Sequence, residues 1–173
     1  GKTTWEDGTV QIGTYHEGVW QATEWGLLFA AESTDAITVS DEASSFIKEN
    51  ADFFPSDSVE KFQDNVDESI TYKMVMKEPD KYGNKIMKAN DLYVVQINTS
   101  QIYKDCEDKY TYAILCDNDL NIYQIYMMGE LPDIYEGDTI KAMYGTPVGN
   151  NSYESSNGGF VNSVVVAPCW IQK

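Results

Sequence analysis

The feature that most constrains the fold is a series of five strand-like segments in the last part of the chain, separated by turn-forming residues. They are rich in β-branched and aromatic residues, and they span 84–98, 110–116, 121–128, 139–145 and 159–168. Short strands that alternate with turns are typical of sandwiches and barrels. Their order predicts a small five-stranded barrel, an architecture that serves as a binding scaffold more often than as a catalyst.

Helical segments are expected ahead of the barrel. A first helix should begin at the cap residue Ser40 and run for about three turns to a point before Pro55. A second is expected from Asp57, which has capping-box spacing to Glu60, and a third covers 72–77. Helices first and strands afterwards indicate an α+β fold, mainly β, with two or three short helices packed on a five-stranded barrel.

The chain therefore divides into three parts. Residues 1–36 are expected to form an N-terminal arm or a small β segment, 37–82 a helical segment that packs on the barrel, and 83–173 the barrel itself. Within the barrel, 117–119 should be a hairpin turn, and the polar, glycine-rich stretch 146–159 should be a long loop. Long loops on rigid scaffolds are common recognition sites.

The charge of the chain disfavours nucleic acid as a partner. There are 28 acidic and 12 basic residues, the formal net charge is −16, and all the basic residues are lysine. Phosphate binding needs cationic surface, and bidentate recognition normally uses the planar fork of arginine. Both halves of the chain are acidic, so no basic patch is hidden in the barrel, and anionic membrane surfaces should be repelled as well.

The cysteines and the chain ends leave the cellular compartment open. Cys106, Cys116 and Cys169 lack zinc-site or redox spacing; Cys116 and Cys169 could meet across the barrel or remain buried free thiols. No apolar run is long enough to span a bilayer. Because the chain opens with Gly1 rather than Met, we expect the native N-terminus, with any secretion signal or lipid anchor, to lie outside this sequence.

No catalytic, metal or cofactor motif is recognisable. The stretch 117–121 begins like an EF-hand loop, but Ile122 and Met128 stand where that loop needs Gly and Glu. The single histidine, His16, lacks recognisable partners for a metal site or a catalytic triad. We therefore expect a protein that is not an enzyme and that uses no cofactor.

The 12 tyrosines are the stronger indication of a binding site. On a barrel of this type the usual binding surface comprises the second and third strands and the loops that flank them. Aromatic rings beside amides suit sugars or peptide backbones, although strand alternation must turn about half of the rings inward. The candidate ligand-binding residues are Tyr103, Tyr110, Tyr112, Tyr123, Tyr126, Asn150, Asn151 and Tyr153.

Several of these segments resemble a known class of module. PDKYG, LYVVQI, YTYAILCD, NIYQIYM and IYEGDTIKAMYG, followed by SYES and GG, are similar to OB-fold modules of the anticodon-binding-like type. Such modules recur in uncharacterised secreted proteins and lipoproteins of Gram-positive bacteria. The resemblance covers 72–168 and implies a location outside the cytoplasm, but it implies no defined ligand.

Three hypotheses follow. The leading one is a non-catalytic extracytoplasmic OB-fold module that binds a protein or a carbohydrate through its tyrosines. The second is single-stranded nucleic-acid binding by base stacking, which the net charge of −16 and the lack of arginine disfavour. The third is a purely structural or oligomerisation module.

Overall fold

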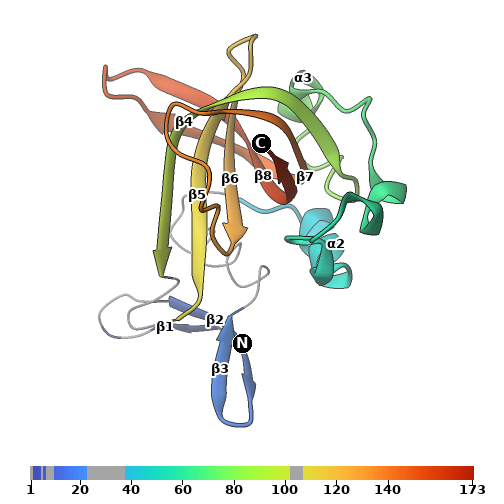
Figure 1. The fold of residues 1–173 in the computed structure, drawn as a ribbon, viewed down its shortest axis with the longest axis vertical. Coiled ribbons are helices and arrows are strands. Elements are labelled where there is room, and N and C mark those ends of the chain that lie inside the picture. Colours follow the sequence, from blue (N-terminus) through green and yellow to red (C-terminus); the bar gives the residue numbers. More distant parts are fainter. Residues whose placement is uncertain (1, 5, 7–9, 23–37, 102–106) are drawn as a thin grey trace.

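The computed structural model describes residues 2–4, 6, 10–22, 38–101 and 107–173, and for the strands before residue 23 it describes the backbone alone. Its main feature is a closed barrel of five strands (Figure 1). The strands are β4 Met87–Gln101, β5 Lys109–Cys116, β6 Ile122–Met128, β7 Thr139–Glu154 and β8 Phe160–Gln172. Around the barrel they follow the order β4, β5, β6, β8, β7, and β7 pairs with β4. The prediction of a mainly β fold with a five-stranded barrel after short helices is confirmed.

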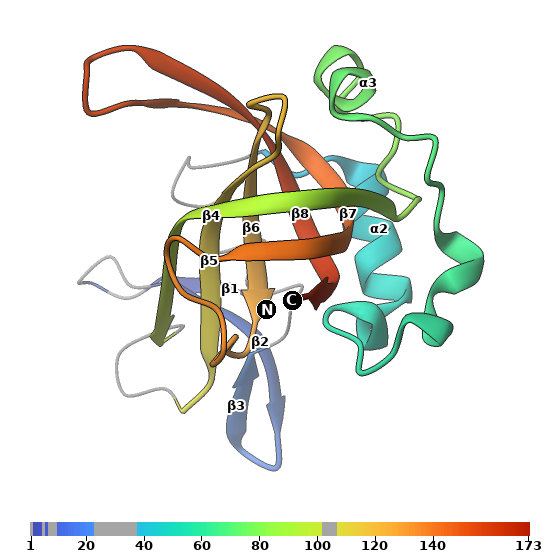
Figure 2. The same ribbon diagram turned by 45° about the horizontal axis from the view of Figure 1, so that its top comes forward.

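The prediction of a long loop at 146–159 is wrong. Residues 146–154 belong to β7 and pair with β8 as far as Glu154 and Phe160, so that only a short turn joins the two strands. The two strands extend beyond the barrel as a twisted arm (Figure 2). Polar residues suit this arm because a two-stranded ribbon is held by its backbone ladder and exposes much of its side-chain surface to water.

The barrel interior is filled by inward-facing residues of all five strands. Alternation along β5 and β6 directs Ala113, Leu115, Tyr123 and Ile125 inward. The segment between β6 and β7 adds Ile134, which is also buried in this cluster. The other buried members are Ile70, Val75, Met87, Ala89, Leu92, Val94, Ile140, Met143, Val164 and Val166.

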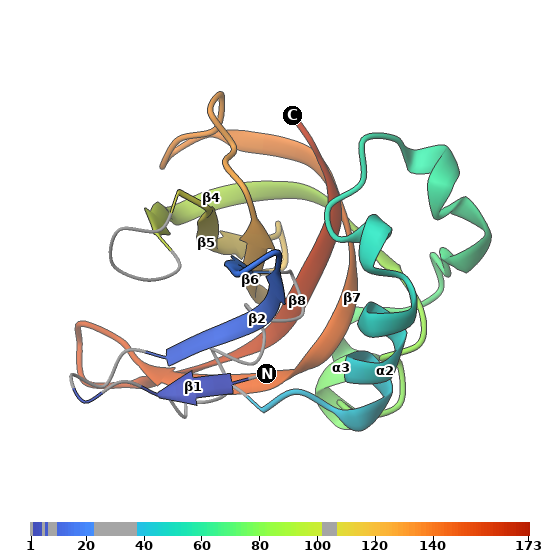
Figure 3. The same cartoon turned by 90° about the horizontal axis from the view of Figure 1, so that it is seen from below.

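A helical layer covers the outer side of β7 and β8 (Figure 3). Helix α2, Asp41–Glu49, begins where the Ser40 hydroxyl accepts a hydrogen bond from the Ala43 N–H at 3.2 Å. The Ser40 N–H donates to the Val148 carbonyl at 2.9 Å, which fixes the start of α2 on β7. Beneath the layer lies a second cluster of buried residues, comprising Val39, Ala43, Phe46, Ile47, Phe54, Phe62, Ile86, Val148, Val165, Ala167 and Cys169.

The first helix is shorter than expected. It ends at Glu49, because the Asn50 side-chain amide and its backbone N–H both donate to the Phe46 carbonyl and so close the last turn. A separate 3₁₀ turn, η1 Ala51–Phe53, then precedes Pro55. The extent predicted for this helix is corrected accordingly.

The expected second helix is replaced by two 3₁₀ turns, η2 Val59–Lys61 and η3 Gln63–Asn65. Asp57 does not cap a helix; its carboxylate pairs with Lys61 at 2.9 Å. The apolar spacing is satisfied differently, since Phe62 packs under the helical layer. The third helix, α3 Tyr72–Lys77, is confirmed at the expected residues.

The N-terminal part contains a three-stranded antiparallel sheet, β1 Lys2–Thr4, β2 Val10–His16 and β3 Val19–Ala22. Strands β2 and β3 are joined by Glu17 and Gly18, both with positive φ, as a two-residue hairpin turn requires. Among the residues that the structure describes, no helix has both the length and the apolar character needed to cross a bilayer.

Candidate functional site

The outer surface of β5, β6 and the second half of β4 carries tyrosines and amides without a formal charge. The strand registers place Asn98, Tyr112 and Tyr126 in one row across the three strands, and Gln96, Ile114 and Gln124 in the next. Asn151 and Tyr153 of β7 lie beside this surface. We call it the tyrosine–amide face, formed by Tyr93, Gln96, Asn98, Ser100, Tyr110, Tyr112, Ile114, Cys116, Ile122, Gln124, Tyr126, Met128, Asn151 and Tyr153.

Gln124 organises the centre of this face. Its side chain is only 4% exposed, and its carboxamide uses both ends. The Oε1 atom accepts hydrogen bonds from the Ser163 hydroxyl at 2.8 Å and from the Asn151 amide at 3.1 Å. The Nε2 atom donates to the Tyr112 hydroxyl oxygen at 2.7 Å. The network therefore ties β5, β6, β7 and β8 together through a single buried amide.

The same network orients the Tyr112 hydroxyl. Because its oxygen accepts from Gln124, its hydrogen is available to an acceptor other than Gln124. Burial raises the pKa of Tyr112, while the Gln124 hydrogen bond acts in the opposite direction. The phenol thus stays protonated at neutral pH and can act as a neutral hydrogen-bond donor.

Two further tyrosines border Tyr112. The ring of Tyr126 packs against it at a centroid distance of 5.0 Å, and burial together with neighbouring phenols raises the pKa of Tyr126 to about 12. Tyr153 approaches from β7; its pKa is raised by burial and by the proximity of Tyr112 and Cys116. All three rings are half-buried, so each has a fixed position and an accessible part.

The structure brings only some of the predicted site residues together. Tyr110, Tyr112, Asn151 and Tyr153 belong to the tyrosine–amide face. Asn150 is exposed, but alternation along β7 turns its side chain to the side opposite Asn151.

The structure corrects the prediction that Tyr123 is a ligand-binding residue. It points into the barrel and is 3% exposed, because its position on β6 shares the inward parity of Ile125. Its ring packs against Tyr72 at 5.3 Å rather than against a ligand surface. Tyr103 lies outside the described residues.

Sequence reasoning missed Gln124, Gln96 and Asn98. A polar residue that alternates with inward apolar positions is ordinarily read as solvent-facing, and Gln124 is instead buried by its partners. The available signal was its position on β6 in the row next to Tyr112 and Tyr126, which requires the register to be known.

The other candidates for chemistry have structural roles. The expected hairpin at 117–119 is confirmed, and the Asp117 carboxylate accepts from the backbone N–H groups of Asp119 and Asn121, both at 2.9 Å. Cys116 and Cys169 are free thiols, not a pair, and burial raises the pKa of each. Cys106 lies outside the described residues, and within the described part no group of acidic, cysteine or histidine side chains could hold a metal ion.

Comparison of the chain with protein-family models, with curated proteins and with solved structures gave no match.

Proposed function

We propose that this protein is a non-catalytic, extracytoplasmic binding module that holds an uncharged carbohydrate on the tyrosine–amide face. The observation that carries the proposal is the chemical character of that face: half-buried tyrosine rings around a buried amide network, with no charged side chain among its residues. The formal charge of the whole chain is −16, whereas the residues of this face carry no charge.

Sugar rings match such a face in two ways. Their apolar C–H faces pack on aromatic rings, and their hydroxyl groups exchange hydrogen bonds with phenols and amides. Tyr112, held by Gln124, offers a neutral donor, and Gln96 and Asn98 on the neighbouring strand are exposed amides. In the wider fold, the corresponding surface of strands two and three binds oligosaccharides as well as oligonucleotides.

Nucleic acid fits this face poorly. Single-strand binders combine stacking rings with cations that follow the phosphates. Lys109, at the start of β5, is paired with Glu130 at 3.1 Å. Its charge is therefore already balanced next to the face, and the long-range field of the protein is negative.

A catalytic role is also disfavoured by the chemistry of the face. Its one thiol, Cys116, has a raised pKa through burial and the nearby Asp117 carboxylate, whereas a nucleophilic cysteine needs a lowered one. An extracytoplasmic location rests on the resemblance of the sequence to secreted modules.

Calorimetric titration with a panel of neutral oligosaccharides tests the proposal. Tyr110→Leu and Tyr153→Leu remove a ring but keep an apolar side chain, and each should weaken binding about threefold to tenfold. The matched control is Tyr135→Leu, because Tyr135 is 66% exposed in the turn before β7, away from the face.

Unchanged affinity in both face variants, or absence of binding across the panel, contradicts the proposal. Salt-sensitive binding of a single-stranded oligonucleotide at the same face contradicts it in favour of the nucleic-acid alternative.

A further inference from the structure

Among the described residues, the second half of β4 has a neighbouring strand on one side only. β4 pairs with β7 through residues 87–93 and with β5 through residues 93–101. In Figures 1 and 2 the end of β4 lies at the rim of the barrel, with β5 on one side of it and no strand on the other. The barrel is therefore closed along the first half of β4, where β4 pairs with β7. The second half of β4 forms an edge.

Backbone hydrogen bonds show which groups face this edge. The Val94 N–H donates to the Asp138 carbonyl at 2.8 Å, and its carbonyl accepts from Gly137 at 2.9 Å, so Val94 points away from β5. The β-bulge between Val94 and Gln96 inserts one residue. After it, Ile97 and Thr99 are the residues whose N–H and C=O groups point away from β5.

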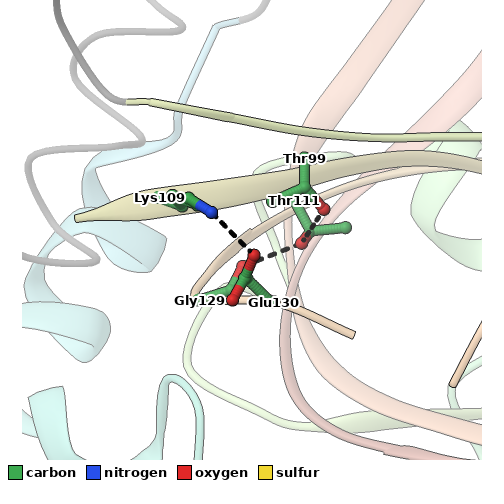
Figure 4. A network of polar contacts seen from close by, with 5 residues as sticks. All are labelled: Thr99, Lys109, Thr111, Gly129 and Glu130. Atoms are coloured by element: carbon green, nitrogen blue, oxygen red, sulfur yellow. Dashed lines mark hydrogen bonds and ion pairs between the residues drawn. The ribbon is translucent and has the colours of Figure 1, made fainter. Parts of the chain in front are cut away.

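Two contacts on β5 agree with this assignment. The Lys109 carbonyl accepts from the Gly129 N–H at 2.8 Å and so points toward β6, and alternation points the backbone of Thr111 the same way. Thr111 is opposite Thr99, with their hydroxyl oxygens 3.3 Å apart, as expected for a pair that exchanges no backbone hydrogen bonds (Figure 4). No hydrogen bond to the backbone groups of Ile97 or Thr99 on the open side is present among the described residues.

Residues 95–101 lack the residue types that usually protect an edge strand against pairing. Edge strands are commonly blunted by lysine, proline or inward charges. Residues 95–101 contain none of these, and the bulge at Val95 precedes the open stretch instead of interrupting it. An unprotected edge is a template for strand addition, in which main-chain hydrogen bonds give affinity and pockets for alternate side chains give specificity.

A pocket of about 240 Å³ lies beside the edge. It is lined by Ile97 and Thr99 of β4 and by Glu130, Leu131, Ile134 and Tyr135 from the segment between β6 and β7. The volume is below the roughly 300–1,000 Å³ of typical small-molecule sites, so it suits one anchoring side chain. A strand paired with Ile97 and Thr99 would direct every second side chain to this side of the sheet.

The negative charge near the pocket favours a basic partner. Glu130 is balanced by Lys109, and Asp138 lies 3.8 Å from Lys173. The Lys173 ammonium also donates to the Asp133 backbone carbonyl, but the carboxylates of Asp133 and Glu136, in the same segment, form no ion pair among the described residues. A second copy of this chain would bring another charge of −16 to the same edge, whereas a basic segment is attracted.

We propose that the open edge of β4 is a docking site for an extended segment of a partner protein, in which an apolar anchor alternates with lysine or arginine. The segment pairs with Ile97 and Thr99, places its apolar side chain in the pocket and its cations near Asp133 and Glu136. This site uses backbone groups of β4 and is independent of carbohydrate binding on the tyrosine–amide face.

The test is amide hydrogen exchange of the full chain, read by NMR, with a short synthetic peptide in which valine alternates with lysine. In the free protein, the amides of Ile97 and Thr99 should exchange faster than those of Asn98 and Ser100, which bond to β5. The peptide should slow the exchange of Ile97 and Thr99 selectively, and the effect should weaken as salt is raised.

Matched probes separate strand pairing from other contacts. The same peptide methylated on the backbone nitrogens that face β4 should bind roughly tenfold or more weakly. Thr99→Pro removes the N–H directed at the open side and should abolish the peptide effect, whereas Thr99→Val, which loses the same hydroxyl but keeps that N–H, should preserve it. Because methylation changes the peptide alone, it remains decisive if Thr99→Pro does not fold.

Three results overturn the proposal. The first is exchange at Ile97 and Thr99 that the peptide leaves unchanged. The second is equal binding of a control peptide with glutamate in place of lysine. The third is protection of the two amides that appears without peptide, rises with protein concentration and accompanies a doubled mass, because the edge then pairs with a second copy.

Discussion

Gln124 offers the sharpest test of how the candidate site is held together. Replacing it by methionine keeps the length of the side chain and removes both hydrogen-bonding ends. Three partners lose a contact: Tyr112, Asn151 and Ser163. The first two are half-buried and can turn to water, but the Ser163 side chain is fully buried.

The expected loss in the free energy of unfolding follows from that difference in burial. A buried hydroxyl without a partner destabilises a protein by about 1–3 kcal/mol, while a partner that rehydrates loses much less. Ser163 keeps only a longer contact, 3.3 Å, to the Asn151 carbonyl. We therefore expect Gln124→Met to lower the free energy of unfolding by about 2 kcal/mol.

A double-mutant cycle with Ser163→Ala isolates this mechanism. Ser163→Ala alone should lower the free energy of unfolding by about 1 kcal/mol. In the methionine background the same change removes a buried hydroxyl that has only the 3.3 Å contact to the Asn151 carbonyl, so the double variant should be no less stable than Gln124→Met alone. Urea unfolding followed by circular dichroism measures all four proteins, and the slope of the free energy with urea should be unchanged. Additivity within about 0.5 kcal/mol would refute the reasoning.

Three further predictions concern packing and pH. Thr146→Val should raise the free energy of unfolding by about 1 kcal/mol in urea titrations, because the Thr146 hydroxyl is buried without a hydrogen-bond partner; a loss of stability would contradict this. Gly149→Ala should destabilise by more than about 2 kcal/mol, since a Cβ there meets the Thr38 carbonyl oxygen, and an unchanged thermal midpoint would show that the contact relaxes. The pKa of Tyr126 is raised in the folded state, so its contribution to stability is complete below about pH 10 and is lost as the pH rises toward about 12. Tyr126→Phe should therefore reduce the loss of stability at alkaline pH, measured as the midpoint of urea unfolding. A pH profile identical to that of the unmodified protein would contradict the assignment.

The barrel could be predicted from local patterns because its strands are short, alternate regularly and are separated by turn residues. The arm of β7 and β8 could not: Asn150, Asn151 and Ser152 have poor strand propensity, and their strand conformation comes from pairing with residues far along the chain. The wrong prediction of a second helix has the same origin. Phe62 satisfies the apolar spacing by packing under a 3₁₀ turn, a tertiary contact that helical periodicity does not contain.

The candidate site was predictable in part. Tyrosine content directed attention to the outer surface of β5 and β6, but the inward direction of Tyr123 depends on the parity of β6, which a shift of one residue in register would reverse. The role of Gln124 needs four strands in register, and the open edge of β4 depends on one bulge. Such features arise from long-range pairing rather than from local composition.

The most direct test of the central claim is an NMR titration of the protein, with its tyrosine rings isotopically labelled, against the neutral oligosaccharide panel. The account predicts that the ring signals of Tyr110, Tyr112 and Tyr153 shift together, while those of Tyr123, buried in the barrel, and Tyr135, exposed elsewhere, stay in place. Shifts confined to Tyr135, or no shift at any of the three face tyrosines at saturating sugar, would contradict the claim that this face binds carbohydrate.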